Sequence, residues 1–325
     1  MSYQTLRGHF LSADKVHQIP YSIFTPQQGA PKGIIQIIHG MSECAARYEQ
    51  GGTVGALCEG GYIVCSSDHL GHGGAVNSPD EYGDVADANL LIEDIRSLRA
   101  ILRTKYRHLP YFFLGHSMGS FLLRRYLQDY PDEMDGAMIM GTSGGNDPAA
   151  AGWLISKAAC LIGLGRKKAP LFASIMRASC NRQLKPAGKG DDWLVSDPAL
   201  LAPWKGNVDH GFPFTCRGYA ALFGLMKTIC DEEFIANTPR SVPIYLLSGE
   251  DDPVGGMGEG VKHLHTLLFE AGVDDLTMTL YPSARHEILN ETIKEQVWAD
   301  MLAWADDQCK SIASAQSIDF GGRSE

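Results

Sequence analysis

Residues 111–120 read YFFLGHSMGS, an apolar run that ends abruptly in a serine framed by glycines and then takes on helical spacing. In a sharp turn from strand to helix the serine backbone is held under strain, and glycines two residues to either side avoid collisions where the chain doubles back. This geometry is called a nucleophile elbow, because it leaves the serine oxygen exposed above a sheet. Ser117 is therefore our candidate nucleophile.

A second stretch has the same pattern in a different context. Residues 141–145 read GTSGG and also follow an apolar run, but residues 146–148 read NDP, which favours a loop over the start of a helix. With 36 glycines in 325 residues, a Gly-x-Ser-x-Gly match is weak evidence by itself. We assign the elbow to Ser117 rather than Ser143, because only Ser117 has a strand pattern before it and a helix pattern after it.

Composition limits the class of protein. Of the 325 residues, 44% are hydrophobic, which is enough for a substantial core. The formal net charge of −10 argues against nucleic acid as a partner, because phosphate binding needs a basic face. We see no apolar signal sequence and no run approaching the roughly 18 apolar residues that span a bilayer. The eight cysteines are scattered without zinc-like spacing, so we expect reduced thiols in a cytoplasmic protein.

Strand and helix patterns alternate along most of the chain. Residues 5–26 alternate between apolar and polar around a turn, which predicts an antiparallel hairpin at a sheet edge. Six further strands are predicted at 33–38, 62–66, the run before Ser117, 136–140, 243–249 and 276–281. The alternation predicts an α/β fold with a mostly parallel, eight-stranded sheet covered by helices on both faces.

About a hundred residues separate the last two predicted strands from the six before them. Such a gap is too long for a loop. We therefore interpret residues 143–240 as an inserted helical cap on a core formed by 1–142 and 241–310. A helix is predicted from about 287 to 307, and the tail, 311–325, is rich in serine and glycine and is predicted to be disordered.

A serine hydroxyl needs a base to take its proton and an acid to orient that base. Further along the chain than Ser117, an acidic loop follows the seventh predicted strand, and His286 comes shortly after the eighth. Loops at the carboxyl ends of parallel strands converge, so we expect His286 to be the base. Glu250, Asp251 and Asp252 are adjacent in the acidic loop. We favour Asp252 as the acid and keep Asp251 as the alternative.

The oxyanion of a tetrahedral intermediate needs backbone N–H donors. Met118 follows the candidate nucleophile and fits the first donor by its position. Met41 fits the second, because Gly40 after a buried strand lets the backbone turn inward. We expect His39 to anchor this loop through a hydrogen bond rather than to act as a base.

These motifs resemble the monoacylglycerol lipase and lysophospholipase branch of the α/β-hydrolase superfamily. The resemblance covers about residues 5–305, in the motifs HGMSE (39–43) with Arg47-Tyr48, DHLGHG (68–73), GHSMG (115–119), the loop 249–254, RHE (285–287), WLVSD (193–197) and GFPFT (211–215). It implies an α/β-hydrolase fold and a catalytic triad of Ser117, Asp252 and His286. It also implies Met41 and Met118 as oxyanion donors in an esterase without metal or cofactor, whose substrates are single-acyl-chain lipids or similar esters.

Two positions depart from the family pattern, and they leave the substrate open. Cys44 stands where members often have histidine, and Ala75 where they often have serine. Cys44 is either a thiol at the pocket mouth or, as we favour, a buried residue at the start of a helix. Alternatives to the lipase are a small-ester carboxylesterase, a serine aminopeptidase or amidase, and a binding protein that retains the triad. The sequence does not indicate an oligomeric state.

The predicted cap reverses the charge of the chain. Residues 148–190 contain no Asp or Glu and eight basic residues, Lys157, Arg166, Lys167, Lys168, Arg177, Arg182, Lys185 and Lys189. Apolar residues such as Leu161 and Ile162 lie among them. A basic, apolar helical segment suits peripheral contact with a lipid surface, and we expect the cap to form an apolar acyl-binding channel above Ser117. The alternative is that the basic residues pack the cap onto an acidic core.

Overall fold

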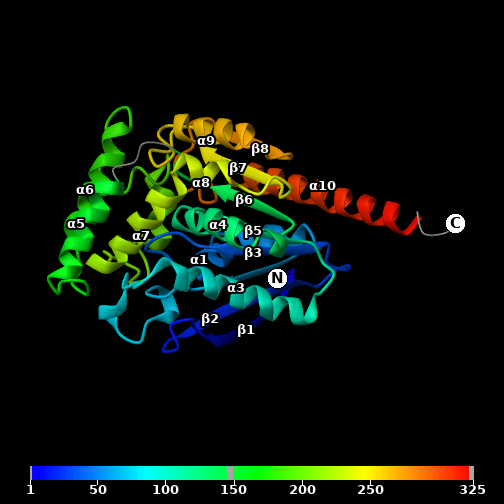
Figure 1. Ribbon diagram of the computed structural model, residues 1–325, viewed down its shortest axis with the longest axis horizontal. Helices are drawn as coiled ribbons and strands as arrows, with labels where there is room; N and C mark the ends of the chain where they lie inside the picture. The colour runs from blue at the N-terminus through cyan, green and yellow to red at the C-terminus, as the bar shows by residue number, and fades with distance from the viewer. Residues whose placement is uncertain (1, 145–148, 322–325) are drawn as a thin grey trace.

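The computed structural model describes residues 2–144 and 149–321, so Met1, the cap residues 145–148 and the tail residues 322–325 lie outside it. One sheet has eight strands in the order β1-β2-β4-β3-β5-β6-β7-β8 (Figure 1). The strands are β1 (Tyr3–Leu11), β2 (Gln18–Pro26), β3 (Gly33–Ile38), β4 (Tyr62–Ser67), β5 (Tyr111–His116), β6 (Gly136–Met140), β7 (Ile244–Gly249) and β8 (Leu276–Tyr281). β2 pairs antiparallel with β1 and β4, and all other pairs are parallel. The predicted sheet and its edge hairpin are confirmed.

Helices cover both faces of this sheet. One face packs on α3 (Ala88–Lys105), α4 (Met118–Asp129) and α9 (Glu259–Glu270), and the other on α1 (Ala46–Gln50), α2 (Thr53–Glu59) and α10 (Lys294–Gly321). In β5, Tyr111 and Phe113 belong to the first core, whereas Phe112 and Leu114 belong to the second, and all four are fully buried. The strand is continuously apolar because it is buried on both faces.

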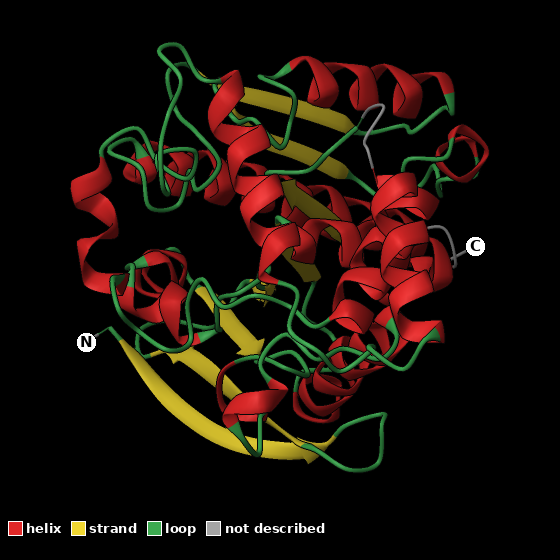
Figure 2. Cartoon of the chain, turned by 90° about the vertical axis from the view of Figure 1, so that its left-hand side faces the viewer, coloured by secondary structure: helices red, strands yellow, loops and turns green. Residues whose placement is uncertain are grey.

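The cap lies between β6 and β7. It contains α5 (Ala149–Leu161), α6 (Pro170–Gln183), the 3-10 helix η4 (Pro198–Trp204), α7 (Cys216–Ile229) and α8 (Glu232–Ala236). Short 3-10 helices elsewhere are η1 (Gly73–Ala75), η2 (Pro79–Glu81) and η3 (Pro131–Glu133). In Figure 1, α5 and α6 lie at the opposite end of the molecule from the C-terminal end of α10. Figure 2 looks onto this cap side, with the curved strand that begins near the N-terminus at one edge of the sheet.

Helix α10 differs from its prediction at both ends. It begins at Lys294 rather than near 287, because residues 287–293 form turns whose Glu287 and Glu291 bind other segments. It continues through Gly321, so the structure corrects the predicted disorder for residues 311–321. No proline interrupts this stretch, and its alanines favour helix, whereas the serine content alone suggested a coil. Within the ranges that the structure describes, no helix has the length and hydrophobicity needed to cross a bilayer.

Candidate active site

Ser117 alone forms the turn between β5, which ends at His116, and α4, which begins at Met118. Its backbone has φ 54° and ψ −120°, and holding a residue other than glycine at positive φ costs about 1–3 kcal/mol. Two hydrogen bonds hold the turn: Ser117 N–H donates to the Met140 carbonyl at 3.0 Å, and Ser120 Oγ donates to the Ser117 carbonyl at 2.6 Å. The strand, turn and helix predicted around Ser117 are therefore confirmed.

Close packing fixes this turn against the end of β3. A Cβ atom added to Gly119 would lie 2.0 Å from the carbonyl oxygen of Ile38, so only glycine fits where α4 meets β3. A Cβ atom added to Gly40 would lie 3.2 Å from Ser117 Cβ. The loop after β3, which carries Met41, therefore passes directly beside Ser117.

The loops after β7 and β8 meet through Asp252 and His286. His286 Nδ1 lies 3.1 Å from Asp252 Oδ1 and 3.0 Å from Oδ2. Asp252 is fully buried and also accepts hydrogen bonds from Ser248 Oγ at 3.1 Å and from Val254 N–H at 2.8 Å. Asp251 is partly exposed. The structure thus brings Asp252, rather than Asp251, against His286.

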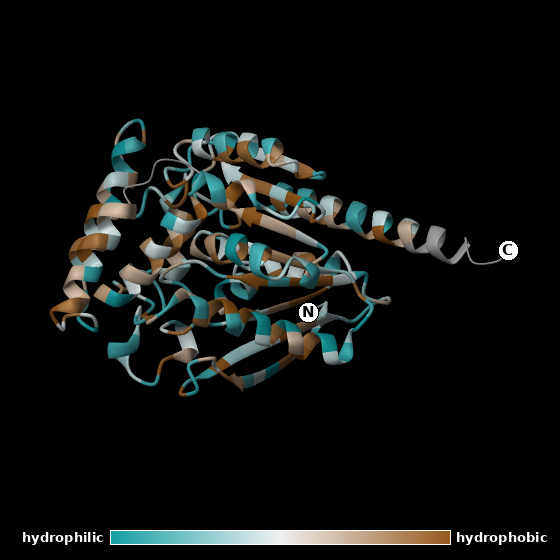
Figure 3. Ribbon diagram, viewed as in Figure 1, coloured by the Kyte–Doolittle hydropathy of each residue, from teal (hydrophilic) through white to brown (hydrophobic). Residues whose placement is uncertain are grey.

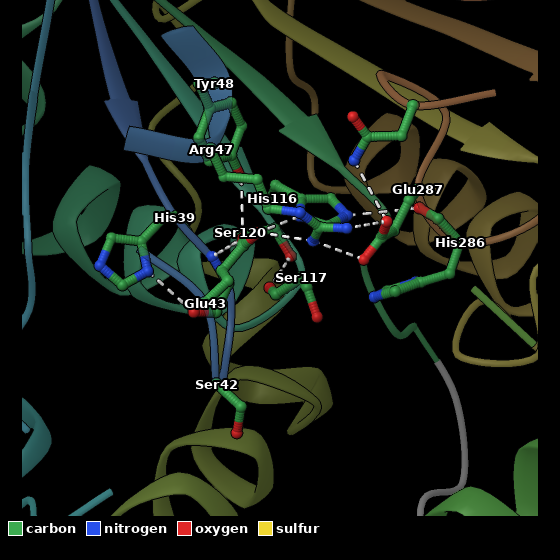
Figure 4. Close-up of polar contacts among 12 residues, drawn as sticks. His39, Ser42, Glu43, Arg47, Tyr48, His116, Ser117, Ser120, His286 and Glu287 are labelled. Carbon is green, nitrogen blue, oxygen red and sulfur yellow. Dashed lines mark hydrogen bonds and ion pairs between the residues drawn. The ribbon is translucent and has the colours of Figure 1, made fainter. Parts of the chain in front are cut away.

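Charge complementarity keeps this carboxyl group ionised. Burial by itself would raise the pKa of Asp252, but the charge and hydrogen bond of His286 lower it below the ordinary value of 3.8. A carboxylate at this position favours the His286 tautomer with its proton on Nδ1, which leaves Nε2 as the proton acceptor of the ring. In Figure 4, Ser117 lies between Glu43 and the ring of His286.

The predicted oxyanion donors are Met41, in the loop after β3, and Met118, at the start of α4. Met118 is the first residue of α4, so its N–H has no partner within the helix. Among the described groups, neither Met118 N–H nor Met41 N–H donates a hydrogen bond. His39 anchors the Met41 loop as predicted, because its Nδ1 donates to the Gly40 carbonyl at 2.9 Å and its Nε2 accepts from His69 N–H at 3.0 Å.

A buried charged cluster supports the loop after β3 and the loop after β8 (Figure 4). Arg47 donates to Glu43 Oε2 at 2.9 Å and to the two carboxylate oxygens of Glu287 at 2.6 and 2.5 Å. Glu43 also accepts from the Gly40 N–H and, at 2.9 Å, from the Tyr48 hydroxyl. Arg47 thus connects the loop that carries Met41 to the residue that follows His286.

His116, the neighbour of Ser117 in the chain, completes this cluster. Its Nδ1 lies 3.4 Å from Glu43 Oε1 and its Nε2 lies 3.3 Å from the His286 carbonyl oxygen. Burial by itself would lower the pKa of His116, but Glu43 raises it above the ordinary value of 6.5. Burial would likewise raise the pKa of Glu43, but His116 and Arg47 hold it well below its usual range. With His116 protonated, two carboxylates face two cations, which lowers the cost of burying them.

The inner cap segment, which we define as residues 192–215, also contacts the site loops. Glu287 N–H donates to the Leu194 carbonyl at 2.8 Å, and Gly211 N–H donates to the Ser42 carbonyl at 2.9 Å. The guanidinium of Arg47 lies 5.1 Å from the ring centre of Trp204. The inner cap segment is therefore part of the wall around Ser117 and His286.

Sequence reasoning missed the roles of this cluster and of the cap residues on it. Glu43 and Arg47 have the i, i+4 spacing of a helical ion pair, so their ion pair could have been predicted from the sequence. Nothing in the sequence indicates that Arg47 also binds Glu287, because 240 residues separate them. Trp204 has no sequence signal at all.

Two other predicted positions lie where the sequence suggested. Cys44 is buried, and burial raises the pKa of its thiol to about 12, so the buried interpretation of this residue is confirmed. Ser143 lies in the loop after β6, where its carbonyl accepts from Arg124 at 2.6 Å. Within residues 2–144 and 149–321, no group of three or more His, Cys, Asp or Glu side chains is placed to hold a metal ion.

Comparisons with known proteins agree with this geometry. Residues 29–293 match the model of the family described as serine aminopeptidase, S33. The chain is 27% identical over 295 residues to a monoacylglycerol lipase of Mycolicibacterium smegmatis, covering 88% of this chain and 92% of the relative. It is 25% identical over 319 residues to the human monoglyceride lipase, covering 96% and 94%.

A solved structure resembles the chain over nearly its whole length. The thermostable carboxyl esterase of Bacillus coagulans, determined in complex with glycerol, superimposes with a TM-score of 0.87 and is 29% identical. The match covers 95% of this chain and 99% of that one.

Proposed function

We infer the function of this chain from the family to which it belongs, the α/β-hydrolases described as serine aminopeptidase, S33, and from its place in their monoglyceride lipase branch. The protein is a serine ester hydrolase. We propose that it acts on single-acyl-chain lipids and that Ser117, Asp252 and His286 are its catalytic triad. The observation that carries the proposal is the buried Asp252–His286 pair at the same sheet edge as the strained Ser117 turn.

In this mechanism Ser117 Oγ attacks the ester carbonyl carbon while His286 Nε2 takes the serine proton. Asp252 holds the imidazole in the required tautomer, and the N–H groups of Met41 and Met118 stabilise the oxyanion. His286 then returns the proton to the departing alcohol, which leaves an acyl-enzyme. A water molecule attacks the acyl-enzyme with His286 again as base, releases the fatty acid and restores Ser117.

The carboxylates around the site favour an ester substrate over a peptide with a free amine. An aminopeptidase needs an acidic group that is available to bind the substrate's ammonium group. Glu43 and Glu287 both bind Arg47, and Asp252 binds His286. A substrate amine would have to displace one of these buried partners, at a cost of several kcal/mol.

Aromatic side chains of the cap support the proposed acyl channel. The ring of Phe172 on α6 lies 5.1 Å from Tyr219 and 5.8 Å from Phe223, both on α7. Phe214 in turn lies 5.7 Å from Tyr219 and 5.3 Å from His72. This apolar interior suits a long acyl chain, so p-nitrophenyl octanoate should be hydrolysed faster than the acetate. A strong preference for acetate would favour the small-ester alternative.

Substitution of the candidate nucleophile tests the proposal directly. Ser117→Ala should lower kcat for decanoyl glycerol by at least about 10³-fold and abolish fluorophosphonate labelling. Ser143→Ala is the matched control, because it removes the serine of the second Gly-x-Ser-x-Gly pattern, and it should retain labelling. Labelling that survives in Ser117→Ala would refute the assignment. Hydrolysis of amino-acid p-nitroanilides in preference to esters would instead favour the aminopeptidase, and ligand binding without labelling of the wild type would favour a binding protein.

We further propose that α5 and α6 dock the protein on anionic lipid surfaces. Figure 3 shows apolar residues along α5, at the outer end of the molecule. The exposed fractions reach 62% for Leu154, 88% for Leu161, 74% for Ile162 and 71% for Leu171. Apolar residues that are exposed beside basic ones favour burial in the interfacial region of a bilayer.

The basic residues of this region divide into two groups. Arg166 lies 3.4 Å from Asp84 and Lys168 donates to the Tyr82 carbonyl, so these two bind the core as the packing alternative expects. Arg177 lies 3.4 Å from Asp191, which belongs to the cap itself. Five others make no salt bridge in the part of the chain that the structure describes, namely Lys157, Lys167, Arg182, Lys185 and Lys189. These five are exposed and available to phosphate headgroups.

Co-sedimentation with vesicles tests the docking surface. Wild-type protein should bind phosphatidylglycerol vesicles more strongly than phosphatidylcholine vesicles, and salt should weaken the binding. Leu161→Ser combined with Ile162→Ser should reduce binding severalfold. The control is Leu6→Ser, which replaces a leucine that is 59% exposed on β1, outside the cap. Negligible binding of the wild type at low salt, or equal loss in both variants, would refute the proposal.

A further inference from the structure

The inner cap segment holds the chain on both sides of His286. Arg285 donates to the carbonyls of Asp192 at 2.6 Å and of Val195 at 3.0 Å. Glu291 accepts from the N–H and the hydroxyl of Ser196, each at 2.6 Å. Together with the hydrogen bond from Glu287 N–H to the Leu194 carbonyl, these contacts fix residues 192–196 against the loop after β8. A side chain from residues 192–196 is therefore held in a fixed position relative to His286.

That side chain is Trp193. Its indole ring lies 5.1 Å from the His286 imidazole, with 32° between the ring planes. The imidazole also contacts His116, at 5.0 Å between ring centres. Through Trp193, the inner cap segment therefore contacts the proposed catalytic base.

Within the described residues, the indole nitrogen of Trp193 has no hydrogen-bond partner. Six buried side-chain atoms in the described residues lack one, and of these only Trp193 Nε1 belongs to a ring that contacts His286. A buried N–H without a partner is costly, which calls for an explanation at the site itself. Indole is a donor and never an acceptor, so the missing partner is an oxygen or another acceptor.

We propose that Trp193 Nε1–H binds a hydroxyl oxygen of the substrate's alcohol and selects esters of glycerol or similar polyols. This inference rests on the proposed function. His286 delivers its proton to the oxygen of the departing alcohol, so that oxygen lies beside the imidazole. The indole packs on the same imidazole, so its ring borders the place of that oxygen, and the partner proposed for its N–H is the hydroxyl on the neighbouring carbon of the alcohol. A simple alkyl ester has no group to satisfy this donor.

The charges near Trp193 favour a neutral headgroup over a phosphorylated one. Arg47 is bound to Glu43 and Glu287, and Arg285 is bound to backbone carbonyls. Both Nη atoms of Arg47 and the Nη1 atom of Arg285 are used in these bonds, and an indole N–H supplies no charge. Monoacylglycerols are therefore preferred to lysophospholipids.

A leaving-group series with the full chain tests this selection. The substrates are 1-decanoylglycerol, propyl decanoate, which lacks the two hydroxyls, and decanoyl lysophosphatidylcholine. In the wild type, kcat/KM should be highest for decanoylglycerol. Trp193→Phe keeps an aromatic ring on His286 but removes the N–H, so kcat/KM for decanoylglycerol should fall about tenfold while the value for propyl decanoate changes less than twofold. Trp193→Leu should lower both values, because it also removes the ring.

Trp298→Phe is the matched control, because it removes an indole N–H that donates to Thr53 at 3.1 Å, at a contact between α10 and α2. Its ratio of glycerol to propyl ester activity should equal that of the wild type. If Trp193→Phe left this ratio unchanged in an active, fluorophosphonate-labelled enzyme, the inference would be overturned while the proposed function stood. A preference for lysophosphatidylcholine would overturn the choice of headgroup. A wild type that neither hydrolysed esters nor reacted with fluorophosphonate would overturn both.

Discussion

The two parts of the cap are built in different ways. The inner cap segment is hydrogen-bonded to the loops after β3 and β8, and its Val195 and Thr215 are fully buried. Helices α5 and α6 instead expose large apolar side chains, including Leu161 and Leu171. The cap is therefore not a uniform lid. Its inner part contacts the loops of the candidate active site, and its outer part carries the proposed docking surface.

This contrast predicts separable effects. Changes in the core and in the inner cap segment should alter catalysis and the free energy of unfolding together, because the same buried contacts support both. Changes at the exposed residues of α5 and α6 should alter neither, because surface substitutions away from buried contacts have small effects.

The largest expected effect is on kcat and comes from a substitution in the core. Changes in the cap are compared with it. Asp252→Asn would place an amide donor against His286 Nδ1 and favour the wrong tautomer, so kcat should fall roughly 10⁴-fold. Asp251→Asn, the neighbouring and partly exposed carboxylate, should change kcat less than twofold. Steady-state kinetics on decanoylglycerol measures both. Equal losses in the two variants would contradict the assignment of Asp252.

The next largest effect concerns the charged cluster beneath the inner cap segment. Glu43→Gln removes one partner of buried Arg47 and should lower the free energy of unfolding at neutral pH by about 3–5 kcal/mol. Because the folded pKa of Glu43 lies below its ordinary value of 4.5, its contribution is complete above that value and is lost as the pH falls through the folded pKa. Wild-type stability should thus fall more steeply in acid than that of Glu43→Gln.

Urea unfolding at a series of pH values measures this difference. Glu59→Gln, which alters an exposed carboxylate, should give a curve parallel to that of the wild type. If the Glu43→Gln curve were also parallel to it, Glu43 would not be the titrating group.

A smaller effect is expected at the contact between the inner cap segment and the loop after β8. Glu291 accepts three hydrogen bonds, two from Ser196 and one from Arg285 N–H. Glu291→Gln turns one acceptor into a donor, so unfolding should cost about 2–3 kcal/mol less and kcat should fall roughly tenfold as His286 loses its support. Glu295→Gln, on the exposed start of α10, is the control. An unchanged kcat would show that this part of the cap does not position the base.

The smallest effect is expected on the outer helices. The vesicle-binding variant, Leu161→Ser with Ile162→Ser, should change the free energy of unfolding by less than about 0.5 kcal/mol. Its kcat for a soluble p-nitrophenyl ester should equal that of the wild type. Thermal unfolding and ester hydrolysis without vesicles test this. A loss of stability comparable to that of Glu291→Gln would remove the contrast between the two parts of the cap.

Much of the fold followed from local patterns. The buried strands, the edge hairpin and the turn at Ser117 were predictable because period, apolar runs and glycine spacing are properties of neighbouring residues. The end of α10 was not, because helix and coil are close in free energy for a serine-rich stretch. Its helical state depends on continuation from the packed part of the same helix.

The sequence by itself determined the alternation that builds the sheet, the elbow at Ser117 and the short set of residues from which a triad could be chosen. Only the tertiary structure decided that Asp252 rather than Asp251 meets His286, that Arg47 joins Glu43 to Glu287, and that Trp193 lies against the imidazole. The physical reason is distance along the chain. Local preferences depend on adjacent residues, whereas these contacts join loops tens to hundreds of residues apart, and packing at the carboxyl edge of the sheet selects among partners that are equivalent in sequence.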